Sequence, residues 1–202
     1  MAPSLDALTT LGAVKLYLGL SASDHDQLIE GLLEAVSAQF NAYCDRKLMA
    51  RDYSYLSQDP AYDPDNALLS GSGYPELLLP QYPVVSLTTL VVDGREVAAS
   101  TGGGGYVLDA AAGVVSLVDG MFPRGWHNVG LVYRAGFSMV PADLAQAAVE
   151  QTAVRFQESA AGQGRLGVSA RTLADGSVSY HAGALLPQVQ AVLDRYRNRS
   201  LL

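Results

Sequence analysis

Apolar positions recur with a helical period at both ends of the chain and alternate with polar positions between them. A short helix is predicted first, capped by Thr9 or Thr10 and stopped by Gly19, with Val14, Tyr17 and Leu18 on its apolar side. A longer helix follows, with Ser23 as its N-cap and Arg46 and Lys47 at its C-terminal end. Its apolar positions fall at i, i+3, i+4 and i+7, a stripe typical of a core-facing helix: Leu28, Ile29, Leu32, Leu33, Val36, Phe40 and Tyr43.

From residue 49 the period changes to the alternation of β-strands. Short strands are predicted in "RDYSYLS", "ELLLPQYPVVSLTTLVVDGREV", "YVLDAAAGVVSLVDG" and "NVGLVYRAG", with turns at Asp93-Gly94 and Gly113. The chain then returns to helix near Pro141. A hairpin signal follows at Asp175-Gly176, and the last helix opens at Pro187.

This order predicts an α+β fold, in which the N- and C-terminal helices form a helical bundle and a small antiparallel β unit is inserted between them. The expected parts are residues 1–48, the inserted unit 49–136, and residues 137–202 with a helix, an extended Gly/Ser-rich hairpin loop and a C-terminal helix or arm. The junction between the β unit and the following helix contains Arg134, Gly136 and Pro141.

The composition favours a chain that is partly covered by a partner. Apolar residues make up 49% and charged residues only 16%, although an Ala- and Gly-rich composition has the same effect. The net charge is −7, with 17 acids and 7 bases in residues 1–154 and 3 acids and 6 bases in residues 155–202. The acidic body disfavours tight DNA binding. The basic end fits an acidic partner, DNA or a solvated helix end.

The sequence offers no catalytic, cofactor or metal-binding pattern that fits its context. The three histidines are far apart, and the "GQGRLG" at residues 162–167 follows a helix and not a strand. The acids Asp59, Asp63 and Asp65 lack the glycine and glutamate of a calcium loop. We therefore predict that the chain is not an enzyme and has no cofactor. The single cysteine, Cys44, excludes an intrachain disulfide, and neither a signal peptide nor an apolar run of membrane length is visible.

One alternative from the residues alone is a binding module. The tyrosines of the β unit would recognise a sugar or peptide, or would instead be packing residues or interface anchors: Tyr53, Tyr55, Tyr62, Tyr74 and Tyr82.

Two longer stretches, "LPQYPVVSLTTLVVDG" and "YRAGFSMVPADLAQA", together with the helix order before them, resemble the head–tail connector proteins of tailed bacteriophages. These are also called adaptor or head completion proteins, and the resemblance is to the variants with a β insert. It covers about Leu8 to Tyr196. Another neck component, such as a stopper or tail terminator, is a close alternative.

The resemblance implies a homo-oligomeric ring, typically of twelve subunits, docked on the portal protein in the neck of the virion. DNA would pass through its lumen without sequence-specific binding, and the next neck or tail component, a stopper or tail protein, would dock below. The protein would be made in the host bacterial cytoplasm, with no membrane partner, and gene-transfer particles share this architecture. The implied portal-docking residues are Leu185, Val189, Val192, Tyr196, Arg195, Arg197 and Arg199. A hairpin loop reaching a neighbour or the lumen would contain Arg165, Arg171, Asp175 and Gly176. On this hypothesis the junction at residues 134–136 fixes the angle between the β unit and the helices, so a β-branched residue at Gly136 should disturb assembly more than secondary structure.

Overall fold

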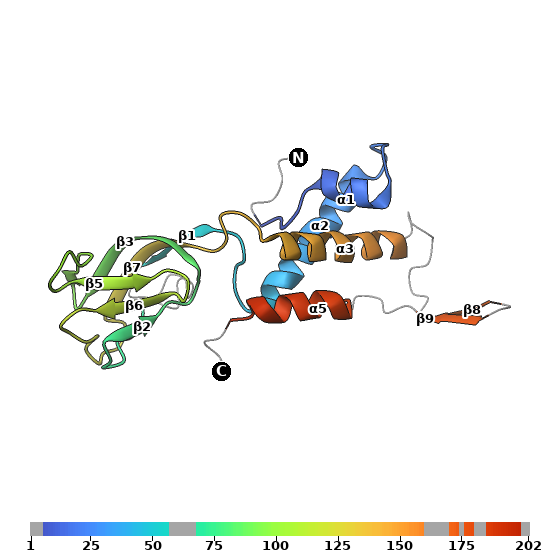
Figure 1. Cartoon of the computed structure of the whole chain (residues 1–202). Helices are drawn as coiled ribbons and strands as arrows, with labels where there is room; N and C mark the ends of the chain where they lie inside the picture. The colour runs from blue at the N-terminus through green and yellow to red at the C-terminus, as the bar shows by residue number, and fades with distance from the viewer. Residues whose placement is uncertain (1–5, 57–67, 160–169, 174–175, 180–184, 199–202) are drawn as a thin grey trace. The chain divides into compact units, whose positions relative to one another are not determined.

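The computed structural model describes residues 6–56, 68–159, 170–173, 176–179 and 185–198 (Figure 1). It divides into two compact units. The helical unit combines residues up to Asp45 with Met139–Asn198, and the β unit is formed by Arg46–Ser138. The described helices occur in the first unit, together with one two-stranded pair, and the two larger antiparallel sheets occur in the second, which confirms the predicted α+β class.

The helical unit is organised around α3, which packs against the other three α-helices. These elements are α1 (Leu11–Leu18), α2 (Asp26–Cys44), α3 (Ala142–Glu158) and α5 (Pro187–Leu193), with the 3₁₀ helix η2 (Asp194–Tyr196) continuing from α5. The core shared by α1, α2 and α3 consists of buried apolar side chains: Val14, Ile29, Leu33, Val149 and Phe156. Within each helix these residues lie on one face, and the burial of their apolar surface away from water stabilises the contact between the helices.

The predicted N-cap is correct for α1 and wrong for α2. Thr10 caps α1, because its hydroxyl accepts a hydrogen bond from the Ala13 N–H at 3.2 Å, and Gly19 ends the helix at φ 69°. The prediction that Ser23 caps α2 is wrong. The helix begins at Asp26, with His25 at the N-cap, because the Ser23 carbonyl accepts from the Asp26 N–H in a preceding turn.

Two further expectations about the helices need correction. Arg46 and Lys47 lie beyond the end of α2, since Asp45 adopts φ 51° and closes the helix after Cys44. Tyr17, expected on the apolar side of α1, is 56% exposed. Pro141 is the N-cap residue of α3, one position before its first turn.

The β unit contains two antiparallel sheets. The larger has the strand order β1-β7-β3-β4, with β1 (Arg51–Tyr55), β7 (Val129–Ala135), β3 (Val84–Val92) and β4 (Arg95–Glu96). The smaller has the order β2-β6-β5, with β2 (Glu76–Leu78), β6 (Val114–Leu117) and β5 (Tyr106–Asp109). The predicted turn joins β3 to β4, where Asp93 and Gly94 have φ 47° and 76°, as a two-residue hairpin loop requires. A third pair, β8 (Ala170–Leu173) and β9 (Gly176–Ser179), forms the predicted hairpin.

Three tyrosines lie in the core of the β unit. Tyr53 and Tyr133 are paired across β1 and β7, and their ring centroids are 5.5 Å apart. Tyr55 stacks on Tyr133 at 5.9 Å. The phenol oxygen of Tyr133 accepts a hydrogen bond from the Gln81 N–H at 3.2 Å, and burial raises the pKa of this phenol. The cluster therefore stabilises the β unit as packing, with Tyr133 held neutral.

Gly136 closes the base of the β unit, where the chain enters and leaves it. The N–H of Phe137 donates to the Leu48 carbonyl at 2.7 Å, and the Ala50 N–H donates to the Phe137 carbonyl at 3.1 Å. Gly136 has φ 111°, and a Cβ there would lie 2.6 Å from the carbonyl carbon and oxygen of Met49. Both the backbone conformation and the close approach therefore require glycine at this position.

We expect Gly136→Ala to destabilise the β unit by at least about 3 kcal/mol, since it combines backbone strain with a backbone clash. Gly94→Ala is the matched control, because Gly94 also has positive φ but a Cβ added there would meet no atom within 4 Å. It should cost only about 1 kcal/mol. Urea unfolding followed by far-ultraviolet circular dichroism measures both. Equal losses of unfolding free energy in the two variants would show that positive φ alone, without the contact to Met49, explains the need for glycine at position 136.

The buried phenol of Tyr133 predicts a pH-dependent stability. The pKa is raised above its ordinary value of 10.0 in the folded state, so the unfolded chain ionises first. Its contribution is thus fully present below about pH 10 and is lost as the pH rises above that value. Tyr133→Phe should cost about 1 kcal/mol at pH 7, through the lost acceptor for Gln81, and should flatten the alkaline decline. The urea concentration at the unfolding midpoint, measured from neutral to alkaline pH, tests this. Tyr74→Phe, at an exposed position, is the control and should leave the alkaline loss of stability as it is in the wild-type chain.

Candidate docking surfaces

The described part of the chain contains no cluster of three or more His, Cys, Asp or Glu side chains that would hold a metal ion. Within the same residues, no helix is both long and apolar enough to cross a membrane. The described histidines His25 and His127 pack on neighbouring rings, with ring centroids 5.4 Å from Phe156 and 4.5 Å from Trp126 respectively. Exposed and partly covered surfaces are the candidate functional features of the described residues.

The predicted portal-docking segment is packed into the helical unit up to Asn198. Val189 and Leu193 are fully buried. The Leu186 N–H donates to Oε1 of Gln151 on α3 at 3.0 Å, and the Asn198 N–H donates to the Cys44 carbonyl at 2.8 Å. Residues at both ends of this segment are thus bonded to other helices. Val189 is part of the core, whereas Leu185 and Val192 are half-buried.

Polar side chains fix the end of this segment as well. Asp143, at the start of α3, accepts hydrogen bonds from the Tyr196 hydroxyl at 2.7 Å and from Arg195 at 2.9 Å. The Tyr43 hydroxyl donates to Asp194 at 2.8 Å, and this bond is the main reason that the pKa of Tyr43 is raised. The guanidinium of Arg197 lies 5.6 Å from the Tyr43 ring centroid. Arg195 and Arg197 nevertheless remain exposed.

The other predicted site residues are distributed over several elements. Arg171 lies on β8 opposite Val178, and Gly176 begins β9. Arg165, Asp175 and Arg199 lie outside the described residues. At the junction, Arg134 is on β7 and forms an ion pair with Asp52 on β1, with an N–O distance of 3.0 Å.

The tyrosines of the binding-module alternative do not gather on one exposed face. Tyr53 and Tyr55 are buried, with 8% and 5% of their surface exposed. Tyr82 is half-buried, and the Arg46 guanidinium lies 4.4 Å above its ring centroid. Tyr74 is exposed, and Tyr62 lies outside the described residues. Among the described tyrosines, packing is therefore the main role of Tyr53 and Tyr55.

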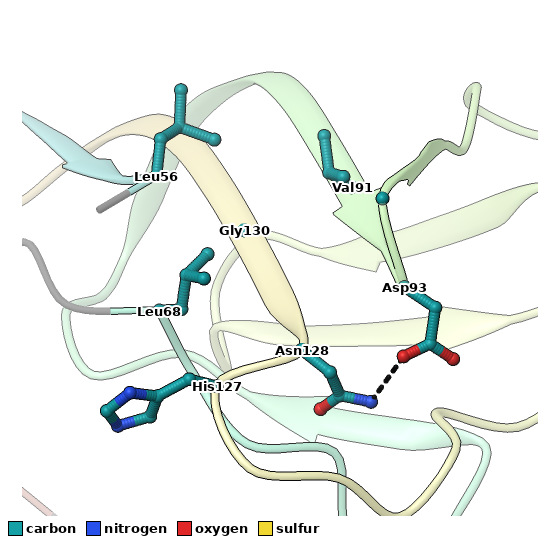
Figure 2. Close-up of a pocket in the computed structure, with 8 residues that line it drawn as sticks. Leu56, Leu68, Val91, Asp93, His127, Asn128 and Gly130 are labelled. Atoms are coloured by element: carbon teal, nitrogen blue, oxygen red, sulfur yellow. Dashed lines mark hydrogen bonds between the residues drawn. The ribbon is translucent and has the colours of Figure 1, made fainter. Parts of the chain in front are cut away.

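A depression of about 300 Å³ lies on the β unit (Figure 2). Leu56, Leu68 and Val91 supply apolar walls, and the side chains of Asp93 and Asn128 form a hydrogen-bonded rim at 3.0 Å. Gly130 opens the floor, since a Cβ there would lie 3.0 Å from the Leu56 and Leu68 methyl groups. His127 also lines the depression, so its lining combines apolar walls with a few polar side chains, as small binding sites do.

The loop before β7 presents exposed apolar side chains that the sequence pattern did not predict. Trp126 is 82% exposed and Met121 is 62% exposed, while Phe122 between them is fully buried. The Phe122 N–H donates to the Tyr74 carbonyl at 2.9 Å, and the His127 N–H donates to Ser70 Oγ at 3.1 Å. An ordered loop that holds a tryptophan in solvent is typical of a docking surface. The signal in the sequence was "MFPRGWHN", which combines turn residues with large apolar ones.

The structure thus combines a helical unit, an inserted β unit and ordered loops with exposed apolar side chains. The chain belongs to the head completion protein family, whose pattern matches residues 7–199. Members of this family are structural proteins of the phage neck, so the prediction of a non-enzymatic protein and the resemblance to this family are both confirmed. No curated protein matches the chain.

Three solved structures share its fold. A chain in the neck of an empty gene transfer agent particle, computed with C6 symmetry, has 20% identity and a TM-score of 0.57 over 100% of this chain and 95% of that one. A chain in the neck of the native particle, computed with C12 symmetry, has 20% identity and a TM-score of 0.52 over 100% and 94%. A chain in the virion of the native particle has 21% identity and a TM-score of 0.57 over 100% and 95%.

We expect Asp143→Ala to destabilise the helical unit by about 1–2 kcal/mol, because Tyr196 loses a charged acceptor and Arg195 is largely exposed. Glu150→Ala on the same helix is the control, since Glu150 pairs with Gln146 one turn away. Thermal unfolding gives the loss of stability, and hydrogen exchange at residues 194–198 should accelerate only in Asp143→Ala. Equal protection in the two variants would contradict a pinning role for Asp143.

Proposed function

We propose that this protein is a head–tail connector subunit in the neck of a phage or gene-transfer particle. Identical copies, twelve in number, form a ring that docks on the portal and extends the channel for DNA. The observation that carries this proposal is the head completion family match across residues 7–199, which includes both units. Neck chains of gene transfer agent particles support it through their shared fold and the cyclic symmetry of their particles.

The charge of the chain supports passage of DNA without retention. The net charge is −7, so the protein as a whole repels phosphate. Tight DNA binding requires clustered Lys and Arg that displace counterions. A lumen lined by such a chain lets DNA slide. The subunit acts on DNA through the electrostatic potential of the ring and makes no base contacts.

The end of the C-terminal segment, from Val192 onward, is the proposed portal contact. Val189 is buried in the subunit core and supports the segment from inside. Arg195 and Arg197 are exposed at the end of the segment, and Val192 is half-buried. These residues meet the portal without unfolding the helix. The ordered loop of the β unit, with Trp126 exposed, is proposed to face the next neck component, a stopper or tail protein.

Mixing the purified chain with portal assemblies from the same particle tests the connector role. Electron microscopy and native mass measurement should show one discrete ring added to one end of the portal. Deleting residues 185–202 would remove Val189 and Leu193 from the core, so a gentler variant is needed. Truncation after Asn198 combined with Arg197→Glu should weaken portal binding at least about tenfold, because it removes exposed charge at the contact.

Arg95→Glu, a charge reversal at an exposed position of β4, is the matched control and should leave portal binding within about twofold. Failure of the wild-type chain to associate with the portal would contradict the connector role. Saturable binding of a sugar or peptide in its place would favour the binding-module alternative.

A further inference from the structure

Helix α1 directs two large apolar side chains into solvent. Leu16 is 84% exposed and Tyr17 is 56% exposed, while Val14 of the same helix is fully buried in the core. Lys15, the one charged residue of α1, forms an ion pair with Asp26 at 2.6 Å. The outward face of α1 is therefore apolar and carries no unpaired charge. Exposed apolar surface of this kind is typical of an interface.

Helix α5 lies on the other side of α3 from α1 (Figure 1). Its outward positions are exposed and uncharged: Pro187, Gln188, Gln190 and Ala191. Interface cores are depleted in charged residues relative to the rest of a surface. The helical unit of a chain with a net charge of −7 thus has two different uncharged faces on opposite sides of its central helix. A ring built head to tail from identical subunits requires two such faces.

We propose that the outward face of α1 in one copy packs against the outward face of α5 in the next copy, with Leu16 and Tyr17 as its anchors. This inference rests on the proposed ring, and it specifies which surfaces form its seam. A second copy is the fitting occupant because a cyclic ring joins two different faces of neighbouring copies, and a neck chain that shares this fold occurs in a particle computed with C12 symmetry. A tyrosine against an uncharged helix also matches the composition of interface cores, which are enriched in aromatic residues and depleted in charged ones.

Crosslinking tests the seam directly. Leu16→Cys and Ala191→Cys are combined in one chain, rings are assembled on portal, and a short thiol-reactive crosslinker is added. A head-to-tail seam should give a ladder of covalent multimers that ends at the full ring. The single variants are controls and should give no ladder, because the native Cys44 is buried with its sulfur 3.7 Å from the Leu193 carbonyl.

Charge insertion provides the second test. Leu16→Glu should lower the ring yield at least about tenfold, since a carboxylate in an apolar contact loses hydration without gaining a partner. Met139→Glu is the matched control, because Met139 is 85% exposed in the same unit, and the ring yield should stay within about twofold. Circular dichroism should show unchanged folding for both. Full ring formation by Leu16→Glu, or equal loss in both variants, would overturn the proposed seam.

The two hypotheses fail in different ways. If the wild-type chain forms no ring on the portal, the proposed connector function is wrong. If wild-type rings form but the double-cysteine variant gives no ladder, the ring stands and the α1–α5 seam is wrong. Crosslinks from the Leu16→Cys variant to the portal would likewise overturn the seam, because they would assign α1 to a different partner.

Discussion

The close backbone approach at Gly136 is the constraint on which the two-unit organisation depends. The chain enters the β unit after Asp45 and leaves it near Ser138, and these two passages are hydrogen-bonded side by side through Leu48, Ala50 and Phe137. Only a residue without Cβ fits against Met49. Because the insertion closes at its base, α2 and α3 can pack together although the sequence places the whole β unit between them.

Regular elements were predictable because their signals are local. The periodic stripe of α2 and the alternation in β1 and β7 follow from burying one face of each element. Thr10 and Gly19 define α1 by capping chemistry that acts within four residues. Ser23 shows the limit of such reasoning. Several polar residues in "SASDHD" are competent caps, and the turn that places Asp26 beside Lys15 decides among them.

Roles that depend on tertiary contacts were harder to predict. Tyr53 and Tyr55 look like surface aromatics in an alternating strand, but their partner Tyr133 lies about 80 residues away on β7 and draws them into the core. Val189 shows the same problem for a docking candidate. A helical apolar stripe indicates that a face is covered, and it does not distinguish cover by the same subunit from cover by a portal. Trp126 was missed because nothing local indicates that Phe122 would be buried and Trp126 exposed.

Polar side chains in this protein mostly fix backbone positions. Asp143 fixes the end of the C-terminal segment through Tyr196 and Arg195, and Asn128 bonds to Asp93 at the rim of the depression. Each of these side chains is satisfied by a partner within its own unit, which leaves apolar groups as the outward features of α1 and of the loop before β7. Rigid presentation lowers the entropy lost on association. Among the described residues, Leu16 and Trp126 are held exposed on ordered elements, so a contact made through them would need no refolding of α1 or of the loop before β7.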